Sequence, residues 1–297
     1  MKTIRNDIPK LDICTLSEYQ QDDIIVSRFS EYLSQHYSHL AAPHRHSFYH
    51  MVFFTEGTGN HTIDFNHFQV HPYQIYFMVP GQVHSWNFEG KVDGYVVNFS
   101  TAFFQSFLLR PDYIDSFSFL IGDTQKSVIN LPDQIKDSII ALFEKLVSQS
   151  QSGFSLSADM IRVLLLQIFI QIEQGHVSDD INNLLIQNNM LLRNFRKLIE
   201  RNFLDLKLPG EYAELLYIST NHLNALCKEH LGMQAGELVR ERIVLEAKRL
   251  LVNLDVSVSE IAYKLNFNDN SYFAKFFKKE VGMTPDAFRK KMTAKRH

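Results

Sequence analysis

The chain has 297 residues, of which 45% are hydrophobic and 21% charged, and its formal net charge is −3. These values are ordinary for folded proteins, so they exclude a disordered or fibrous chain, and the length favours two domains over one core. The longest apolar runs are too short to span a bilayer and neither cysteine belongs to a ligand-spaced pair, so we expect a cytoplasmic protein without disulfides.

The charges are distributed unevenly along the chain. Residues 1–189 contain 11 Lys and Arg against 20 Asp and Glu, whereas residues 190–297 contain 19 against 13. An acidic part joined to a basic part predicts that only the second part contacts a polyanion. A chance imbalance between two surfaces is the alternative explanation.

Up to about residue 125, short apolar runs alternate with turns. Runs at 48–55, 61–70, 74–79 and 94–99 are separated by segments that contain Gly or Pro. Several short strands at this spacing predict an antiparallel sandwich or barrel.

From Pro132 onward the hydrophobic period is helical. A second predicted helix, from about Leu156 to Gln174, is apolar nearly all round, so it must be buried on more than one side, in a core or partly in a dimer interface. The polar stretch Gly175–Asn183 is the predicted linker.

The part of the chain after about residue 186 contains an internal duplication. Apolar and small positions match at a separation of 49 residues, and after one inserted residue the match continues at 50. Matched pairs include Ala213 and Ala262, Leu216 and Leu265, Ile218 and Phe267, Leu226 and Phe276, and Gly232 and Gly282.

Each copy has the residues that two helices and a tight turn require. The alanine lets the helices cross closely, Ser219 or Asp269 caps the second helix, and the glycine ends it. The copies therefore predict two helix-turn-helix units, at about 209–232 and 258–282.

Residues from about 185 to 297 resemble the DNA-binding domain of the AraC family of bacterial regulators. The match is densest over Val258–Arg289, which reads VSEIAYKLNFNDNSYFAKFFKKEVGMTPDAFR. The resemblance implies that one long helix, here Gly236–Val252, joins the two units. Such a helix can set two recognition helices about one duplex turn apart on double-stranded DNA.

The resemblance also implies which side chains contact DNA. In the second recognition helix, the residues at base-reading or phosphate positions are Asn270, Ser271, Lys275 and Lys278. In the first, the exposed candidates are Asn221, His222, Asn224 and Lys228. Asn and Lys suit readout of the major groove. Ala225 stands where many relatives carry Arg, which leaves the base contacts of the first helix open.

Histidines gather in the N-terminal half. His44 and His46, two apart on one predicted strand, direct both rings to the same face, and a later Pro-Gly-x-x-His segment returns His84 toward it. This pattern resembles the cupin barrel, and a cupin followed by two helix-turn-helix units resembles the AraC family over nearly the whole chain. Metal-binding cupins usually have Glu where this chain has His50.

Three or four histidines are enough to hold a divalent metal, but regulatory cupins keep these positions as pocket lining, so we expect no metal and no cofactor. The barrel interior is the predicted effector pocket. Its candidate lining residues are His44, His46, Tyr49, Phe53, His84 and Trp86, whereas His61, His67 and His71 are expected at the surface or in turns.

The predicted fold class is thus a multidomain α+β protein. A cupin-like effector-binding β-barrel occupies 1–125, a helical connector that dimerises occupies 126–183, and an all-α DNA-binding domain occupies 184–297. The expected partners are DNA, an unidentified small-molecule effector, a second copy of the chain, and RNA polymerase if the regulator activates, as family members more often do. We expect no enzymatic activity and no membrane contact.

Two alternatives stay open at this point. The histidines also fit a cupin metalloenzyme, a dioxygenase or isomerase, with an appended helical domain. An architectural DNA-binding protein whose barrel only dimerises would explain the sequence as well. Bound metal together with turnover of a substrate would favour the metalloenzyme. DNA binding and regulation that need no ligand would favour the architectural protein.

Overall fold

A computed structural model describes residues 10–12, 23–40, 42–105, 107–152, 154–176, 183–252 and 256–294. The chain divides into two compact units, one formed by Pro9–Ser178 and one by Asp179–His297. The first is rich in strands and the second is helical among the described residues, which confirms the predicted fold class. Most of the predicted linker, Gly175–Asn183, lies outside the described residues.

The strands of the first unit form one sheet in the order β1-β3-β7-β4-β6-β8, with β2 paired to β7 and β5 to β4. The pairs are antiparallel except for β1 with β3. The strands are β1 (Lys10–Leu11), β2 (Ile24–Arg28), β3 (His44–His46), β4 (Tyr49–Ile63), β5 (Asn66–Val70), β6 (Gln74–Met78), β7 (Val83–Phe99) and β8 (Val128–Asn130).

The two long strands β4 and β7 bend the sheet around an interior. Their pairing shifts register between Phe54 and Thr58, and such irregularities bend a strand. Gly94 lies at this bend, where a Cβ would come within 1.9 Å of the carbonyl oxygen of Phe53, so no larger residue fits. Residues from both halves of the strands share one buried cluster, which includes Val52, Phe54, Ile63, Tyr76, Trp86 and Val96.

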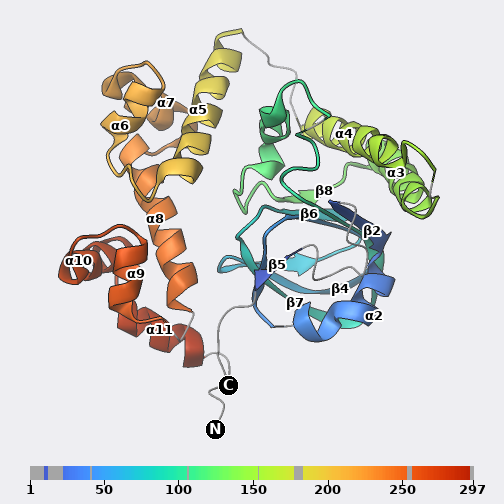
Figure 1. The fold of residues 1–297 in the computed structure, drawn as a ribbon, viewed down its shortest axis with the longest axis horizontal. Helices are drawn as coiled ribbons and strands as arrows, with labels where there is room; N and C mark the ends of the chain where they lie inside the picture. Colours follow the sequence, from blue (N-terminus) through green and yellow to red (C-terminus); the bar gives the residue numbers. More distant parts are fainter. Residues whose placement is uncertain are drawn as a thin grey trace. The chain divides into compact units, whose positions relative to one another are not determined.

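Helices cover the outer face of the sheet (Figure 1). Helix α3 (Asp133–Gln151) and helix α4 (Ser157–His176) pack on a second buried cluster that contains Phe53, Tyr95 and Phe143. The predicted connector helices therefore belong to the same compact unit as the sheet. The other helical elements in the described part of this unit are α2 (Phe29–Leu40), η1 (Pro111–Ser116) and η2 (Ser118–Leu120).

Within a single copy of the sheet-containing unit, helix α4 is buried on one side. Leu165 and Phe169 are fully buried, but Met160 and Val163 remain 47% and 48% exposed. The dimer interface predicted as one alternative for this helix stays a prediction.

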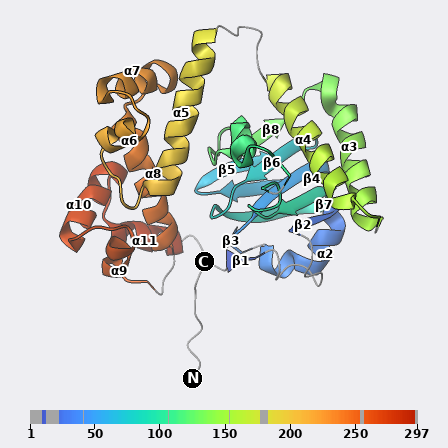
Figure 2. The same ribbon diagram turned by 45° about the horizontal axis from the view of Figure 1, so that its top comes forward.

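The second unit is an array of helices around α8 (Figures 1 and 2). Its elements are α5 (Asn183–Asn202), α6 (Pro209–Leu215), α7 (Thr220–Leu231), α8 (Ala235–Leu251), α9 (Val258–Lys264), α10 (Asn270–Val281) and α11 (Pro285–Ala294). Helix α8 differs by one residue at each end from the predicted joining helix. Among the described helices, none combines the length and the hydropathy that crossing a membrane requires.

Candidate functional site

The two helix-turn-helix units have the same local structure. The N–H of Ile218 donates to the carbonyl of Ala213 at 3.0 Å, and the N–H of the matched Phe267 donates to Ala262 at 2.9 Å. These bonds close the turn after α6 and after α9. The two copies of the duplicated sequence therefore share this closing hydrogen bond.

The ends of the recognition helices α7 and α10 are also matched. The Ser219 side chain accepts the N–H of His222, and Asp269 accepts that of Ser271, so each caps a helix N-terminus. Gly232 and Gly282 end the two helices in the left-handed conformation, with φ of 73° and 80°. Both helices thus begin and end as predicted.

Helix α8 holds the two recognition helices in one array. Asn224 of α7 accepts the backbone N–H of Ala235, the first residue of α8, at 3.1 Å. Arg240 of α8 forms an ion pair with Glu280 of α10 at 3.2 Å. In both views α7 and α10 lie on the same side of α8, at different levels along it (Figures 1 and 2).

Most of the residues predicted to contact DNA are exposed. The buried faces of α7 and α10 consist of apolar residues and one cysteine, including Leu223, Cys227, Phe273 and Phe277. Seven predicted contact residues lie on the solvent side: Asn221, His222, Lys228, Asn270, Ser271, Lys275 and Lys278. Their contacts with bases and phosphates stay predictions.

Asn224 and Lys228 have partners within the domain. Asn224 is half-buried and its amide oxygen is bound to Ala235, so this acceptor is occupied by the protein's own backbone. The ammonium of Lys228 donates to the carbonyl of Gly232 at 3.0 Å but remains exposed. We therefore assign Asn224 a structural role, which differs from its expected position on the DNA-facing surface.

A second connection, through Lys207, joins the two helix-turn-helix units of the DNA-binding domain. This residue was not identified from the sequence. Its ammonium donates to the carbonyls of Leu204 at 3.1 Å and Leu265 at 2.8 Å, and it lies 4.7 Å from the ring centroid of Phe267. Next to it, the Asn266 amide donates to Asp205 at 3.2 Å. We call these contacts the Lys207 joint.

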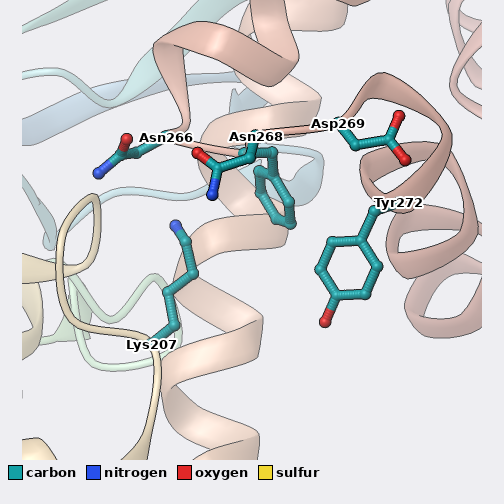
Figure 3. Close-up of a pocket in the computed structure, with 6 residues that line it drawn as sticks. Lys207, Asn266, Asn268, Asp269 and Tyr272 are labelled. Atoms are coloured by element: carbon teal, nitrogen blue, oxygen red, sulfur yellow. The ribbon is translucent and has the colours of Figure 1, made fainter.

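The Lys207 joint borders a groove in front of α10 (Figure 3). Desolvation lowers the pKa of Lys207, which is consistent with its half-buried position. The groove is lined by Lys207, Asn266, Phe267, Asn268, Asp269 and Tyr272. Through this joint, the loop before α6 holds the turn of the second helix-turn-helix unit.

Five histidines are buried together inside the folded sheet. His44 and His46 come from β3, His50 and His61 from β4, and His84 from β7, and each is at most 2% exposed. The Nε2 atoms of His46 and His84 are 2.7 Å apart, and Nδ1 of His84 lies 3.0 Å from Nε2 of His61. The His61 ring stacks on Trp86 at a centroid distance of 3.3 Å. We call this group the histidine cluster.

Burial disfavours the charged form of these rings. Desolvation lowers the pKa of His46, His61 and His84 well below the usual value, and that of His50 to about 3. The neighbouring imidazoles lower these pKa values further, because one positive ring disfavours another. Neutral imidazoles are hydrogen-bonding groups and metal ligands.

The structure divides the predicted effector-pocket residues between two faces of the sheet. His44, His46, His84 and Trp86 lie together in the interior. Tyr49 stacks on Phe99, and Phe53 packs on Tyr95 and Phe143 beneath the outer helices, so neither joins them. Alternate residues of β4 point to opposite faces, and register assigns these two to the outer one.

His61 also differs from its expected place. It is fully buried, whereas His67 and His71 are exposed as expected. His61 and His50 are the members of the cluster missing from the predicted pocket. His61 lies opposite the buried Trp86 in the β4–β7 ladder, a pairing that no short motif of the sequence indicates.

Comparisons with known proteins agree with this two-part architecture. The model of AraC-like ligand-binding domains matches residues 30–180, and a helix-turn-helix domain model matches 212–291. The transcriptional activator RhaS of Salmonella schwarzengrund is 22% identical over 256 residues, which cover 82% of this chain and 85% of RhaS. The transcriptional regulatory protein YesN of Bacillus subtilis is 37% identical over 89 residues, 29% of this chain and 24% of YesN.

Among solved structures, ToxT from Vibrio cholerae aligns with a TM-score of 0.42 and 14% identity, over 90% of this chain and 97% of ToxT. The ligand-binding model alone covers half of the sequence, and the helix-turn-helix model covers the duplicated segment. The chain therefore belongs to the AraC family, as a transcription regulator with an N-terminal ligand-binding domain and a C-terminal helix-turn-helix DNA-binding domain.

Proposed function

We propose that the protein activates transcription from a two-part DNA site, which it reads through α7 and α10. The observation that carries this proposal is the pair of exposed recognition helices on one side of α8, each with a side-chain cap at its start and a left-handed glycine at its end. The 17 residues of α8 span about 25 Å at 1.5 Å per residue, a length that suits two successive major grooves.

The proposal includes a homodimer that contacts RNA polymerase and acts in the cytoplasm. RhaS is named a transcriptional activator, which supports activation here. The exposed apolar residues of α4, among them Met160 and Val163, supply a surface for the second copy. We assign residues 1–125 to effector binding, 126–183 to the connector and 184–297 to DNA binding.

Regulation requires a ligand that distinguishes two states. A ligand in the N-terminal domain changes DNA binding only if it binds one arrangement of the DNA-binding domains more tightly than another. We propose that the N-terminal domain performs this role without catalysis, since the relatives are regulators. Turnover of a substrate by a metal-loaded protein would support the metalloenzyme instead.

The test is selection of bound sequences from a random DNA pool by the full-length protein. We expect a two-part site whose halves are about one turn, or 10–10.5 base pairs, apart. Affinity for that site should fall steeply with salt, because Lys contacts with phosphates release counterions. A single short site, or binding that ignores salt, would contradict the proposal.

A further inference from the structure

The hydrogen bonds around the histidine cluster fix which ring nitrogens carry protons. A neutral imidazole has one N–H donor and one bare acceptor nitrogen. Nδ1 of His44 lies 2.9 Å from the carbonyl oxygen of Ala42, which can only accept, so the proton is on Nδ1. Nε2 of His44 therefore has a lone pair.

The same reasoning applies to His50. Its Nδ1 lies 2.5 Å from Oδ1 of Asn98, while the Asn98 amide nitrogen donates to the hydroxyl of Tyr32. The Asn98 oxygen must then accept, and the proton of His50 is on Nδ1. Its Nε2 has a lone pair, is buried, and finds no hydrogen-bond partner in the described structure.

Of the other three rings, those of His46 and His84 share a single proton between their Nε2 atoms. His46 and His84 approach to 2.7 Å at Nε2, a contact that needs one donor and one acceptor. Nδ1 of His84 faces Nε2 of His61, so His84 can move its proton to Nδ1 and donate it there. In that tautomer Nε2 of His84 is bare as well.

The ring nitrogens of three of these histidines lie close together. One ring nitrogen from each of His44, His46 and His84 lies within 4.8 Å of the other two. The His50 ring centroid is 4.7 Å from that of His46 and 5.3 Å from that of His84. Rings this close exclude an organic molecule from the space between them. A metal ion about 2.0–2.1 Å from each nitrogen fits after small ring movements.

We propose that His44, His46 and His84, with His50 as a fourth ligand, bind a divalent transition-metal ion, and that this ion is a ligand of the regulator's N-terminal domain. The donors are all imidazoles, which suit zinc, copper, iron and nickel better than magnesium or calcium. Metal-binding histidines usually donate their other N–H to an outer partner, the role of Ala42, Asn98 and His61. This site differs from the absence of metal expected from the sequence.

The binding test uses untagged full-length protein, stripped with a chelator and titrated with Zn²⁺ by calorimetry. We expect one equivalent to bind to the wild type and to His71→Gln, a control at an exposed histidine. His84→Gln should lose this binding. Asn98→Ala, which removes the outer partner of His50, should weaken it about 10- to 100-fold. No binding to the wild type, or equal binding to His84→Gln, would overturn the site.

A second measurement does not depend on how the buried variants fold. Wild-type protein loaded with Co²⁺ should show visible absorption bands of a nitrogen-ligated ion, without the near-ultraviolet band of a thiolate ligand. A thiolate band, or visible absorption equal to that of free Co²⁺, would contradict imidazole ligation.

The regulatory part of the inference rests on the proposed function and has its own readout. We expect Zn²⁺ to change the affinity of wild-type protein for its selected DNA site and to leave that of His84→Gln unchanged. Metal binding with unchanged DNA affinity would overturn the regulatory part alone. Specific metal binding without sequence-specific DNA binding in either state would overturn the proposed function and leave the metal site standing.

Discussion

The two units of the protein place their polar functional groups in opposite ways. In the sheet unit, five histidines are buried in the interior and held by neighbouring rings and backbone. In the helical unit, the polar residues of α7 and α10 face solvent while apolar side chains hold the helices from behind. A small ligand is recognised by enclosing it, whereas DNA is recognised by fitting exposed helices into its grooves.

The largest expected effect is an acid sensitivity confined to the sheet unit. The pKa values of His46, His50, His61 and His84 are lowered on folding, so below pH 6.5 the unfolded chain binds protons that the folded state does not. Stability is therefore complete above pH 6.5 and falls as the pH drops toward the folded pKa values. Each such histidine contributes about 1.4 kcal/mol per pH unit.

Urea unfolding of metal-free protein over a pH series measures this effect. Trp86 is the chain's single tryptophan and touches the cluster, so its fluorescence reports the sheet unit. The described histidines of the helical unit, His222 and His230, are not buried, and helical circular dichroism should change less. Equal acid sensitivity of both signals would remove the contrast between the units.

Phe53→Ala tests the assignment of this side chain to the outer face. The ring is fully buried against Tyr95 and Phe143, so its loss should cost about 3–5 kcal/mol of unfolding free energy. Zn²⁺ stoichiometry of the folded protein should not change, and Phe53→Leu should cost less. Unchanged stability with weaker ligand binding would return Phe53 to the pocket.

Lys275→Ala tests base reading by α10. The side chain is exposed, so we expect normal stability, a loss of about 1–3 kcal/mol in binding the selected site, and relaxed preference at one base pair. Lys145→Ala, at an exposed position of the sheet unit, removes the same charge as a control. A uniform loss over all DNA sequences would make Lys275 a phosphate contact instead.

Asn224→Ala should have the smallest effect, and on stability more than on recognition. It removes the hydrogen bond to the N–H of Ala235, with a net cost of about 0.5–1.5 kcal/mol in unfolding free energy. Base preference, measured by repeating the DNA selection, should be unchanged. A changed preference at constant thermal stability would restore Asn224 to the base-reading residues.

The helical unit was more predictable because its signals are local. Caps, turn and terminal glycine each depend on a few consecutive residues, and the duplication states them twice. Ser219, Asp269, Gly232 and Gly282 all act as predicted. The Lys207 joint was missed because its partners are 58 residues apart in the chain.

The interior of the sheet was less predictable because strand register is not written in any short motif. His50, Val52 and Phe54 face the interior at even positions of β4, whereas His61 and Ile63 face it at odd ones. The change of parity comes from the register shifts between Phe54 and Thr58. Simple alternation along the strand therefore misplaces residues on one side of the bend.

The Lys207 joint has a consequence for the DNA. Together with α8 it connects the two helix-turn-helix units at two places, which fixes the separation of their recognition helices. An extra base pair between the half-sites moves one of them by about 3.4 Å and rotates it by about 35°. Because two connections fix the separation of the recognition helices, the protein does not adjust to this change. The duplex must bend or twist instead, and sequences that deform easily between the half-sites would tolerate the insertion best.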